Sequence, residues 1–398
     1  MTAIGSGIDA NDLDLLDPEF YGVRARAVYR DLRPLAPVVR DERNGVWGVT
    51  TWQGVRTVGA NPAVFSSAQG TRVESGPVPW MMDKDPPDHT KRRKLVNRGF
   101  TPARVRDHEA RVRALTDRLI DGFCERGECD VRHDLAAPLP LVVICDMLGI
   151  PAADHGHVLD LSDRLLGSLQ GGSDNLAVAM EAFGEWNEYA RRLIVDRREG
   201  PADDLVSVLV HAEVDGDRLT ADELVFEILL LLLGGDETTR NVGCGGLEAL
   251  LLHPEQWVRL HDDPPILPTA VEELLRWVTP IQYMARTVVT DTELAGVRLA
   301  AGEQVLMLYE SANFDEDQFV DPERFSVDRS PNDHVAFGFG AHHCLGASLA
   351  RLELRVLFER VLARLPDLAL VGAPPPRTII GISSMPVSFT PTGRLGLP

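Results

Sequence analysis

The chain has 398 residues, of which 44% are hydrophobic and 25% charged, and its formal net charge is −20. This composition is ordinary for a globular protein and excludes a disordered or fibrous class. The strong negative charge argues against a nucleic-acid-binding protein, because phosphates repel an acidic surface. No internal repeat and no long flexible linker divides the chain, so we expect one domain over residues 1–398.

The compartment can be predicted from the N-terminus, the apolar stretches and the cysteines. Residues 1–16 are acidic and polar, unlike a signal peptide. The most apolar stretch, Leu224 to Leu233, contains Glu227 and is shorter than the roughly 20 residues that span a bilayer. Five cysteines without regular spacing argue against a disulfide framework. We therefore expect a cytoplasmic protein without a membrane anchor.

Helices are expected to dominate, with a minor strand component. Thr220 and Glu223 form a capping box that predicts a helix start, and Gly149 with Pro151 predicts a helix stop. In chain order we expect a strand over Val46–Thr50, a helix over Val105–Cys124, a buried helix or strand over Leu141–Leu148, a helix from Ala221 to about Leu251, a helix from Pro268 to Trp277, strands over Arg286–Val289 and Gln304–Met307, a helix from just after Cys344 to before Pro366, and a strand over Met385–Phe389.

The first polar motif along the chain is a histidine followed four residues later by an arginine. This spacing puts His89 and Arg93 on one face of a helix. Taken alone, each is typical of a surface residue. A local basic cluster accompanies them: Lys91, Arg92, Arg93, Lys94 and Arg98.

The second motif, Gly234 to Thr238, interrupts the apolar helix predicted from Ala221. A glycine costs about 1 kcal/mol relative to alanine inside a helix. The acid–alcohol pair of Glu237 and Thr238 is also costly if it is buried. A helix end would explain these residues, but the apolar pattern resumes at Leu247. We therefore expect the helix to continue through a local distortion.

The third motif pairs Glu273 with Arg276. At a spacing of three residues the two side chains share a helix face and can form an ion pair. Such pairs are common on helices, so this motif by itself indicates little.

The fourth motif, Phe337 to Gly346, is the most informative. Its glycines allow tight turns and a close approach to a flat ligand. The helix after Cys344 directs amides and the positive end of its dipole toward the sulfur, which stabilises a thiolate. A lone cysteine here could also be a buried free thiol. A zinc site with His342 and His343 is another reading, although neighbouring residues seldom converge tetrahedrally.

Together these motifs resemble those of the cytochromes P450. The pattern Phe-x-x-Gly-x-x-x-Cys-x-Gly is complete from Phe337 to Gly346, and the other three motifs occur in the family's order and at its usual spacing. The resemblance covers essentially the whole chain. It implies a mainly α fold with a minor β component, in which a helix-rich lobe and a small β-rich lobe surround a buried heme b (iron protoporphyrin IX). Cys344 is implied to be the thiolate ligand of the iron.

The resemblance also implies roles for other residues. The implied heme contacts are His89, Arg93, Arg286, Phe337, Gly338, His342, Cys344 and Gly346, with the basic side chains on the propionates. Glu273 and Arg276 would join Arg324 in a structural cluster. Glu237 and Thr238 would deliver protons while one oxygen atom of O2 is inserted into a C–H bond, a reaction that an axial thiolate favours.

The chain shows no flavin- or nicotinamide-binding segment, so electrons must come from a partner. The resemblance implies a ferredoxin with its reductase and a monomeric oxygenase that binds no nucleic acid. Because ferredoxins are acidic, the basic cluster is a candidate docking surface. Its proposed docking residues are Arg92, Lys94 and Arg98.

A finer resemblance concerns the substrate. Several stretches look like actinobacterial steroid C26/C27 monooxygenases, which hydroxylate a terminal methyl of cholesterol or cholest-4-en-3-one in cholesterol catabolism. These stretches are residues 92–101, 134–140, 203–210, 234–240, 310–315 and 351–354. By position, the apolar substrate pocket would contain Trp80, Met81, Met82, Leu230, Gly234, Ile281, Met284, Ile382 and Ser384.

Other functions remain open at this point. The same chemistry could act on a terpenoid, fatty acid or polyketide. A heme protein that binds a ligand without turnover is another possibility, although it would not need the Glu237–Thr238 pair. A zinc or structural protein without heme is a third.

Overall fold

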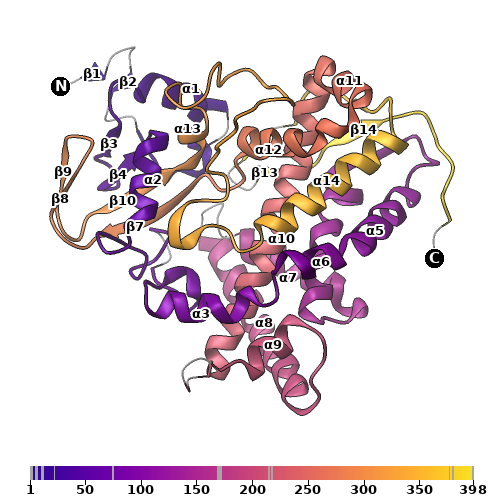
Figure 1. Cartoon of the computed structure of the whole chain (residues 1–398), viewed down its shortest axis with the longest axis horizontal. Helices are drawn as coiled ribbons and strands as arrows, with labels where there is room; N and C mark the ends of the chain where they lie inside the picture. The colour runs from indigo at the N-terminus through magenta and orange to yellow at the C-terminus, as the bar shows by residue number, and fades with distance from the viewer. Residues whose placement is uncertain are drawn as a thin grey trace. The chain divides into compact units, whose positions relative to one another are not determined.

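The computed structural model describes residues 3–4, 8–9, 13–21, 23–73, 76–167, 173–213, 216, 218–375, 377–378 and 381–396 (Figure 1). The chain divides into two compact units. Unit 1 comprises residues 1–93, 275–325 and 331–344, and unit 2 comprises residues 94–274, 326–330 and 345–398.

Unit 1 contains most of the β-structure. Its elements are β1 (Ala3–Ile4), β2 (Ile8–Asp9), the short 3-10 helix η2 (Pro18–Phe20), α1 (Val23–Leu32), β3 (Val38–Asp41), β4 (Val46–Val49), α2 (Trp52–Ala60), β5 (Phe65–Ser66), η3 (Met81–Asp83), β7 (Tyr283–Val288), β8 (Thr292–Leu294), β9 (Val297–Leu299), β10 (Gln304–Leu308), α13 (Tyr309–Asn313) and η8 (Gly340–His342). Helix α3 (Asp88–Asn97) begins in this unit, and the end of α12 (Leu267–Val278) reaches it.

A five-stranded sheet organises unit 1, in the order β3-β4-β10-β7-β5. Only the β4–β10 pair is parallel, with Leu306 opposite Gly48. A Cβ at Gly48 would lie 2.7 Å from Leu15 Cδ1, so only glycine fits this position. The strands are rich in valine, which suits a pleated and half-buried surface, and residues such as Val49, Val305 and Met307 form the core.

Unit 2 contains the long helices. Its elements are α4 (Pro102–Asp107), α5 (Glu109–Asp121), β6 (Glu128–Asp130), the π-helical turn η4 (Arg132–Ala136), α6 (Pro138–Leu148), η5 (Ala152–Asp154), α7 (His155–Gly167), α8 (Ser173–Glu199), α9 (Leu205–His211), α10 (Ala221–Leu252), α11 (Pro254–Asp262), η7 (Pro264–Ile266), α14 (Ala347–Arg364), β11 (Ala369–Leu370), β12 (Arg377–Thr378), β13 (Gly381–Ile382) and β14 (Pro386–Ser388).

Helix α10 is central to unit 2 and packs against α6, α8 and α14 (Figure 1). The predicted capping box is confirmed: Thr220 accepts from the Glu223 backbone, and the Glu223 side chain accepts from Thr220 N at 2.9 Å. All residues from Ala221 to Leu252 are α-helical, which confirms that the helix continues past the glycine pair. The helix continues because its apolar residues are buried on several sides.

Most other predicted elements are confirmed, and the boundaries differ by a few residues. Residues 141–148 belong to a helix, α6, which ends at Gly149 with a left-handed φ of 74°. The single helix expected over Val105–Cys124 is wrong. The segment forms α4 and α5, which meet at His108, where the φ and ψ angles are −79° and −14°.

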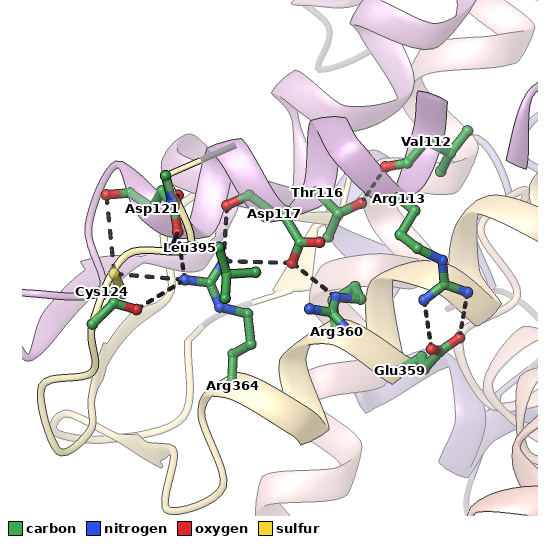
Figure 2. Close-up of polar contacts among 12 residues, drawn as sticks. Val112, Arg113, Thr116, Asp117, Asp121, Cys124, Glu359, Arg360, Arg364 and Leu395 are labelled. Carbon is green, nitrogen blue, oxygen red and sulfur yellow. Dashed lines mark hydrogen bonds and ion pairs between the residues drawn. The ribbon is translucent and has the colours of Figure 1, made fainter. Parts of the chain in front are cut away.

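Buried arginines join α5 to α14 in unit 2 (Figure 2). Arg364 donates to the Asp117 carbonyl at 2.9 Å and to Asp121 Oδ1 at 2.5 Å, while Arg360 donates to Asp117 Oδ1 at 2.8 Å. Asp121 also accepts from Leu395 N at 3.0 Å, which fastens the C-terminal segment. The side chains of Arg364 and Asp117 are only 7% and 5% exposed, so each charge is stabilised by the other and not by water.

We expect Arg364→Ala to lower the free energy of unfolding by about 3–5 kcal/mol, because it leaves buried carboxylates without their partner. Arg355→Ala is the matched control on the same helix. Arg355 pairs with Glu109, and the two side chains are 30% and 36% exposed, so its loss should cost less than about 1 kcal/mol. Urea unfolding of both variants measures the difference, and equal losses would contradict this role of the buried pair.

Candidate active site

In unit 1, Cys344 ends a glycine-rich loop. Its backbone N–H donates to the Phe337 carbonyl at 2.8 Å. Gly338 and Gly340 have positive φ angles of 67° and 76°. A Cβ at Gly340 would lie 2.1 Å from the carbonyl oxygen of Gly59, so the loop packs backbone to backbone against the end of α2. These contacts fix the position of the cysteine.

Cys344 differs from the other cysteines in exposure. Cys124, Cys129, Cys145 and Cys244 are buried, whereas Cys344 is half-buried. Burial raises the pKa values of Cys129, Cys145 and Cys244 to about 12, which makes those thiols poor ligands. Helix α14 begins three residues after Cys344, so its positive N-terminal end follows the sulfur closely in the chain. Cys344 is therefore the cysteine best suited to be a thiolate.

The zinc reading finds no support in the geometry. Within the described part of the chain, no group of three or more His, Cys, Asp or Glu side chains could hold a metal ion.

Four predicted basic residues meet in unit 1. The rings of His89 and His342 lie 4.1 Å apart between centroids, and the Ser67 hydroxyl is 3.2 Å from His342 Nε2. Arg93 donates to the His343 carbonyl at 2.5 Å. Arg286 is 4% exposed and donates to its neighbour's carbonyl, Ala285 O, at 2.7 Å. We call His89, Arg93, Arg286 and His342 the cationic group.

The positive charge of the cationic group lies on its two arginines, because the pKa values of both histidines are lowered. Burial lowers the pKa of Arg286, and burial with the nearby Arg286, His89 and Arg93 lowers the pKa of His342 to about 3. Among the described residues, no carboxylate forms an ion pair with Arg93 or Arg286. Buried guanidinium groups without carboxylate partners suit an anionic ligand.

Two carboxylates lie near the cationic group but are already engaged. Asp83 accepts from Thr71 N at 3.0 Å and from Val78 N at 2.8 Å. Asp85 accepts from Ser67 N at 2.9 Å. These hydrogen bonds hold both carboxylates in place, and neither makes an ion pair with the described arginines of the group.

In unit 2, the two glycines of α10 serve different purposes. A Cβ at Gly235 would lie 2.7 Å from Ile144 Cγ1, so this glycine allows close packing on α6. A Cβ at Gly234 would meet nothing within 4 Å. The Thr238 hydroxyl donates to the Gly234 carbonyl at 3.1 Å, and Glu237 and Thr238 are both half-buried. The acid–alcohol pair therefore borders an open face of the helix.

Glu273 has a partner that sequence reasoning missed. Glu273, which is 0% exposed, accepts from Arg329 Nε at 3.0 Å and from Ser326 N at 3.1 Å. Arg329 was missed because it follows Arg324 closely in the same loop. Arg276 is buried and donates to the Asn313 carbonyl at 2.8 Å. Arg324 is exposed, and its role with Glu273 and Arg276 stays a prediction.

The predicted pocket residues fall in both units. In unit 1, Met81 is buried, Trp80 and Met82 are half-buried, and Ile281 and Met284 pack on the core of the sheet. In unit 2, Leu230 is half-buried, Gly234 is exposed and Ile382 is buried. Ser384 is exposed, and its hydroxyl donates to Asp130 Oδ2 at 2.5 Å. Their joint role in a pocket stays a prediction.

The predicted docking residues do not form one exposed patch. Arg92 is 9% exposed, and its guanidinium donates to the Pro79 carbonyl at 3.0 Å. This burial argues against a role for Arg92 in docking a partner, because its guanidinium group binds a backbone carbonyl of the same chain. Lys94 is exposed on α3, and Arg98 is exposed just after the helix ends at Asn97.

Comparisons with known proteins agree with this arrangement. The family model described as Cytochrome P450 matches residues 173–368. A steroid C26-monooxygenase of Mycobacterium tuberculosis is 51% identical over 397 residues, covering 98% of this chain and all of that protein. A methyl-branched lipid omega-hydroxylase of the same species is 40% identical over 365 residues, covering 87% of this chain and 85% of that protein.

Solved structures agree as well. The Mycobacterium marinum cytochrome P450 CYP268A2 in complex with pseudoionone aligns with a TM-score of 0.88 at 36% identity, over 96% of this chain and all of that one. The sequence and the fold thus both define a P450-type oxidoreductase. The chain belongs to the cytochrome P450 family and is a monooxygenase.

The family's cofactor is heme, and the residues present fit such a group. A heme needs an axial ligand and partners for its two carboxylates. Unit 1 supplies the half-buried thiol of Cys344 and a buried to half-buried cationic group whose arginines form no ion pair with a carboxylate among the described residues. Across the described residues, none of the helices has the length and apolarity needed to cross a membrane.

Proposed function

We propose that this enzyme hydroxylates the terminal methyl group of a sterol side chain, such as that of cholesterol or cholest-4-en-3-one. The main support is the 51% identity to a steroid C26-monooxygenase over essentially the full length of both chains. The net reaction consumes one substrate C–H bond, O2, two electrons and two protons, and yields one alcohol and one water.

We propose that heme b is the cofactor and that Cys344 would hold its iron as a thiolate. His89, Arg93, Arg286 and His342 would bind the propionates: Arg93 and Arg286 form no ion pair with a described carboxylate, and the two histidine rings can donate hydrogen bonds. Phe337, Gly338 and Gly346 would line the proximal loop. When bound, the heme activates O2, and thiolate ligation favours cleavage of the O–O bond.

Within this proposal Glu237 and Thr238 move protons. The Glu237 carboxyl would take up protons and release them toward the open face of α10. The Thr238 hydroxyl donates to Gly234 O at 3.1 Å and would hold a proton beside the open face of α10 for transfer during the reaction. Both side chains are half-buried, so the pair can exchange protons with solvent without being fully hydrated.

The substrate assignment is tested by a spin-state titration of the heme-loaded enzyme. We expect cholest-4-en-3-one to displace the water ligand of the iron and shift the absorption spectrum at micromolar concentration. A linear fatty acid and a cyclic terpenoid are the controls, and we expect weaker shifts from them. A spectral shift with either control but not with the sterol would reject the sterol assignment and leave the monooxygenase assignment intact.

A second candidate substrate is a methyl-branched lipid, which the similarity to an omega-hydroxylase favours. Both substrates present a terminal methyl at the end of a branched chain. Adding a methyl-branched fatty acid to the titration separates them, because a rigid sterol nucleus and a flexible chain bury different areas in the same pocket.

The electrons come from a redox partner, and we propose a ferredoxin served by its reductase. We expect Lys94→Glu to slow the first reduction step about fivefold at low salt, because the charge reversal opposes an acidic partner. Arg298→Glu on β9, which is also exposed, is the control with the same charge change. Stopped-flow reduction at several salt concentrations measures both rates, and the difference should shrink as salt rises. Identical rates for the two variants would exclude Lys94 from docking.

We also propose that the chain acts as one cytochrome P450 domain and as a monomer in the cytoplasm. None of the five cysteines, all of which lie in the described part of the chain, forms a disulfide, as is usual in a reducing compartment.

A further inference from the structure

Two polar contacts tie helix α7 to α10 in unit 2. Arg240 of α10 donates to Asp163 Oδ1 at 2.8 Å, and Ser162 donates to Asp236 Oδ2 at 2.9 Å. Within α10, Arg240 also donates to Asp236 Oδ2 at 3.2 Å. Ser162 and Asp236 are fully buried and Arg240 is 2% exposed, so the Ser162–Asp236 and Arg240–Asp236 contacts are shielded from water, whereas the Asp163 side chain is 50% exposed.

The contacts act on the turn of α10 that carries the acid–alcohol pair. Asp236 and Arg240 are four residues apart, and Glu237 and Thr238 lie between them in the sequence. A helical turn that is held at both ends by another helix has less freedom to rotate or unwind.

This turn is weak by itself. Gly234 and its neighbour Gly235 precede it, and glycine lowers helix stability by about 1 kcal/mol relative to alanine. The Thr238 hydroxyl donates to the carbonyl four residues back, at 3.1 Å, and such bonds slightly destabilise and bend helices. Contacts from another helix can therefore offset the low helical stability of this turn.

The arginine of these contacts is held by nearby carboxylates. Burial alone would lower the pKa of Arg240, but the carboxylates of Asp236 and Asp163 outweigh it and raise that pKa. Burial raises the pKa of Asp236, and the nearby Arg240 and Arg132 act against that rise. Asp236 therefore depends on its cationic neighbours to stay ionised.

We propose that Ser162 and Asp163 anchor α10 through Asp236 and Arg240, and that these four are positioning residues that hold Glu237 and Thr238 for proton delivery. This inference rests on the proposed role of Glu237 and Thr238. It adds a set of residues on α7 that touch neither substrate nor cofactor in the proposed mechanism.

The test compares two aspartates of α7 in the heme-loaded enzyme. Asp163 pairs with Arg240, and its side chain is 50% exposed. Asp160 pairs with Arg164 of its own helix, and its side chain is 60% exposed. Asp163→Ala and Asp160→Ala therefore make the same change at similar exposure, but only the first removes a contact to α10. Both positions reach solvent, so both variants should fold.

The first measurement is hydrogen exchange followed by mass spectrometry. We expect peptides covering residues 233–241 to exchange about fivefold faster in Asp163→Ala, since a charge-assisted hydrogen bond to a half-exposed partner is worth about 1 kcal/mol. Asp160→Ala should leave those peptides unchanged. Unchanged exchange in Asp163→Ala would overturn the anchor itself.

The second measurement is the fraction of electrons that appear in product and not in hydrogen peroxide, at saturating substrate. We expect this fraction to fall several-fold in Asp163→Ala, to stay unchanged in Asp160→Ala and to recover in Asp163→Glu, which restores the carboxylate. Faster exchange with an unchanged product fraction would overturn the link to proton delivery. Failure of the proton-relay proposal itself would instead appear as normal turnover in Glu237 and Thr238 variants.

Discussion

Replacing Cys344 with serine is expected to lower turnover by roughly 1,000-fold, about 4 kcal/mol in activation free energy. A serine hydroxyl does not ionise near neutral pH, so it cannot supply the electron-rich axial ligand that favours O–O cleavage. The loop should keep its shape, because it is held by backbone contacts of Gly340 and Phe337. Product formation and the carbon monoxide difference spectrum of the heme-loaded protein measure the effect.

Cys129→Ser is the matched control for this substitution. Cys129 is buried in unit 2, and its pKa is raised to about 12, so it makes the same chemical change at a thiol that is unsuited to ligation. We expect it to keep both turnover and the thiolate-type spectrum. A thiolate-type spectrum that survives in Cys344→Ser would show that another cysteine binds the iron.

The second large effect is expected at the acid–alcohol pair. Glu237→Gln removes the carboxyl that takes up protons, and Thr238→Val removes the hydroxyl while keeping the side-chain shape. General acid–base groups contribute roughly 10²- to 10⁴-fold, so we expect product formation to fall within that range. Electron consumption should fall less, because electrons still reduce oxygen and leave as hydrogen peroxide. Product and peroxide per electron are the quantities to measure.

Thr239→Val provides the comparison within the same turn. Thr239 is 7% exposed and also lies on α10, but the proposed relay does not use its hydroxyl. Thr238→Ser, which keeps a hydroxyl, should retain most of the activity. If Thr238→Val and Thr239→Val reduce product formation equally, the effect comes from helix stability and not from proton transfer.

The two glycines of α10, which lower its helical stability, differ in what surrounds them. Gly235 is required for packing, since a side chain there would meet Ile144 at 2.7 Å, whereas Gly234 borders open space. A bend-prone turn next to a reacting centre gives room for a ligand at the cost of local stability. Under our proposal, the contacts of Ser162 and Asp163 stabilise this turn and so keep Glu237 and Thr238 in position.

Much of the fold could be predicted from local signals. The start of α10 follows from the capping box at Thr220, and the end of α6 follows from Gly149, which adopts a left-handed conformation. These predictions hold because capping and turn chemistry involve only neighbouring residues. The helix over 105–124 was wrong because the same apolar periodicity continues through His108, where the backbone turns slightly away from helical angles.

The candidate site was only partly predictable. Taken alone, Cys344, His89 and Arg93 could have been ordinary buried or surface residues, and it was the resemblance of all four motifs to the cytochromes P450 that indicated their roles. The burial of Arg92 and the pairing of Glu273 with Arg329 could not be predicted. A sequence gives the charge of an arginine but does not reveal which of several neighbours turns toward a buried acid.

By itself, then, the sequence determined which reactive side chains this protein has and, through the resemblance of its motifs to a known family, which reaction to expect. Tertiary structure alone decided how buried each cysteine is: burial raises the pKa values of Cys129, Cys145 and Cys244 to about 12, whereas Cys344 is half-buried. It also brought Ser162 and Asp163 into contact with Asp236 and Arg240, which lie 74 and 77 residues away in the chain. The reason is physical: desolvation and long-range ion pairs depend on which side chains meet in space, and local sequence does not specify that.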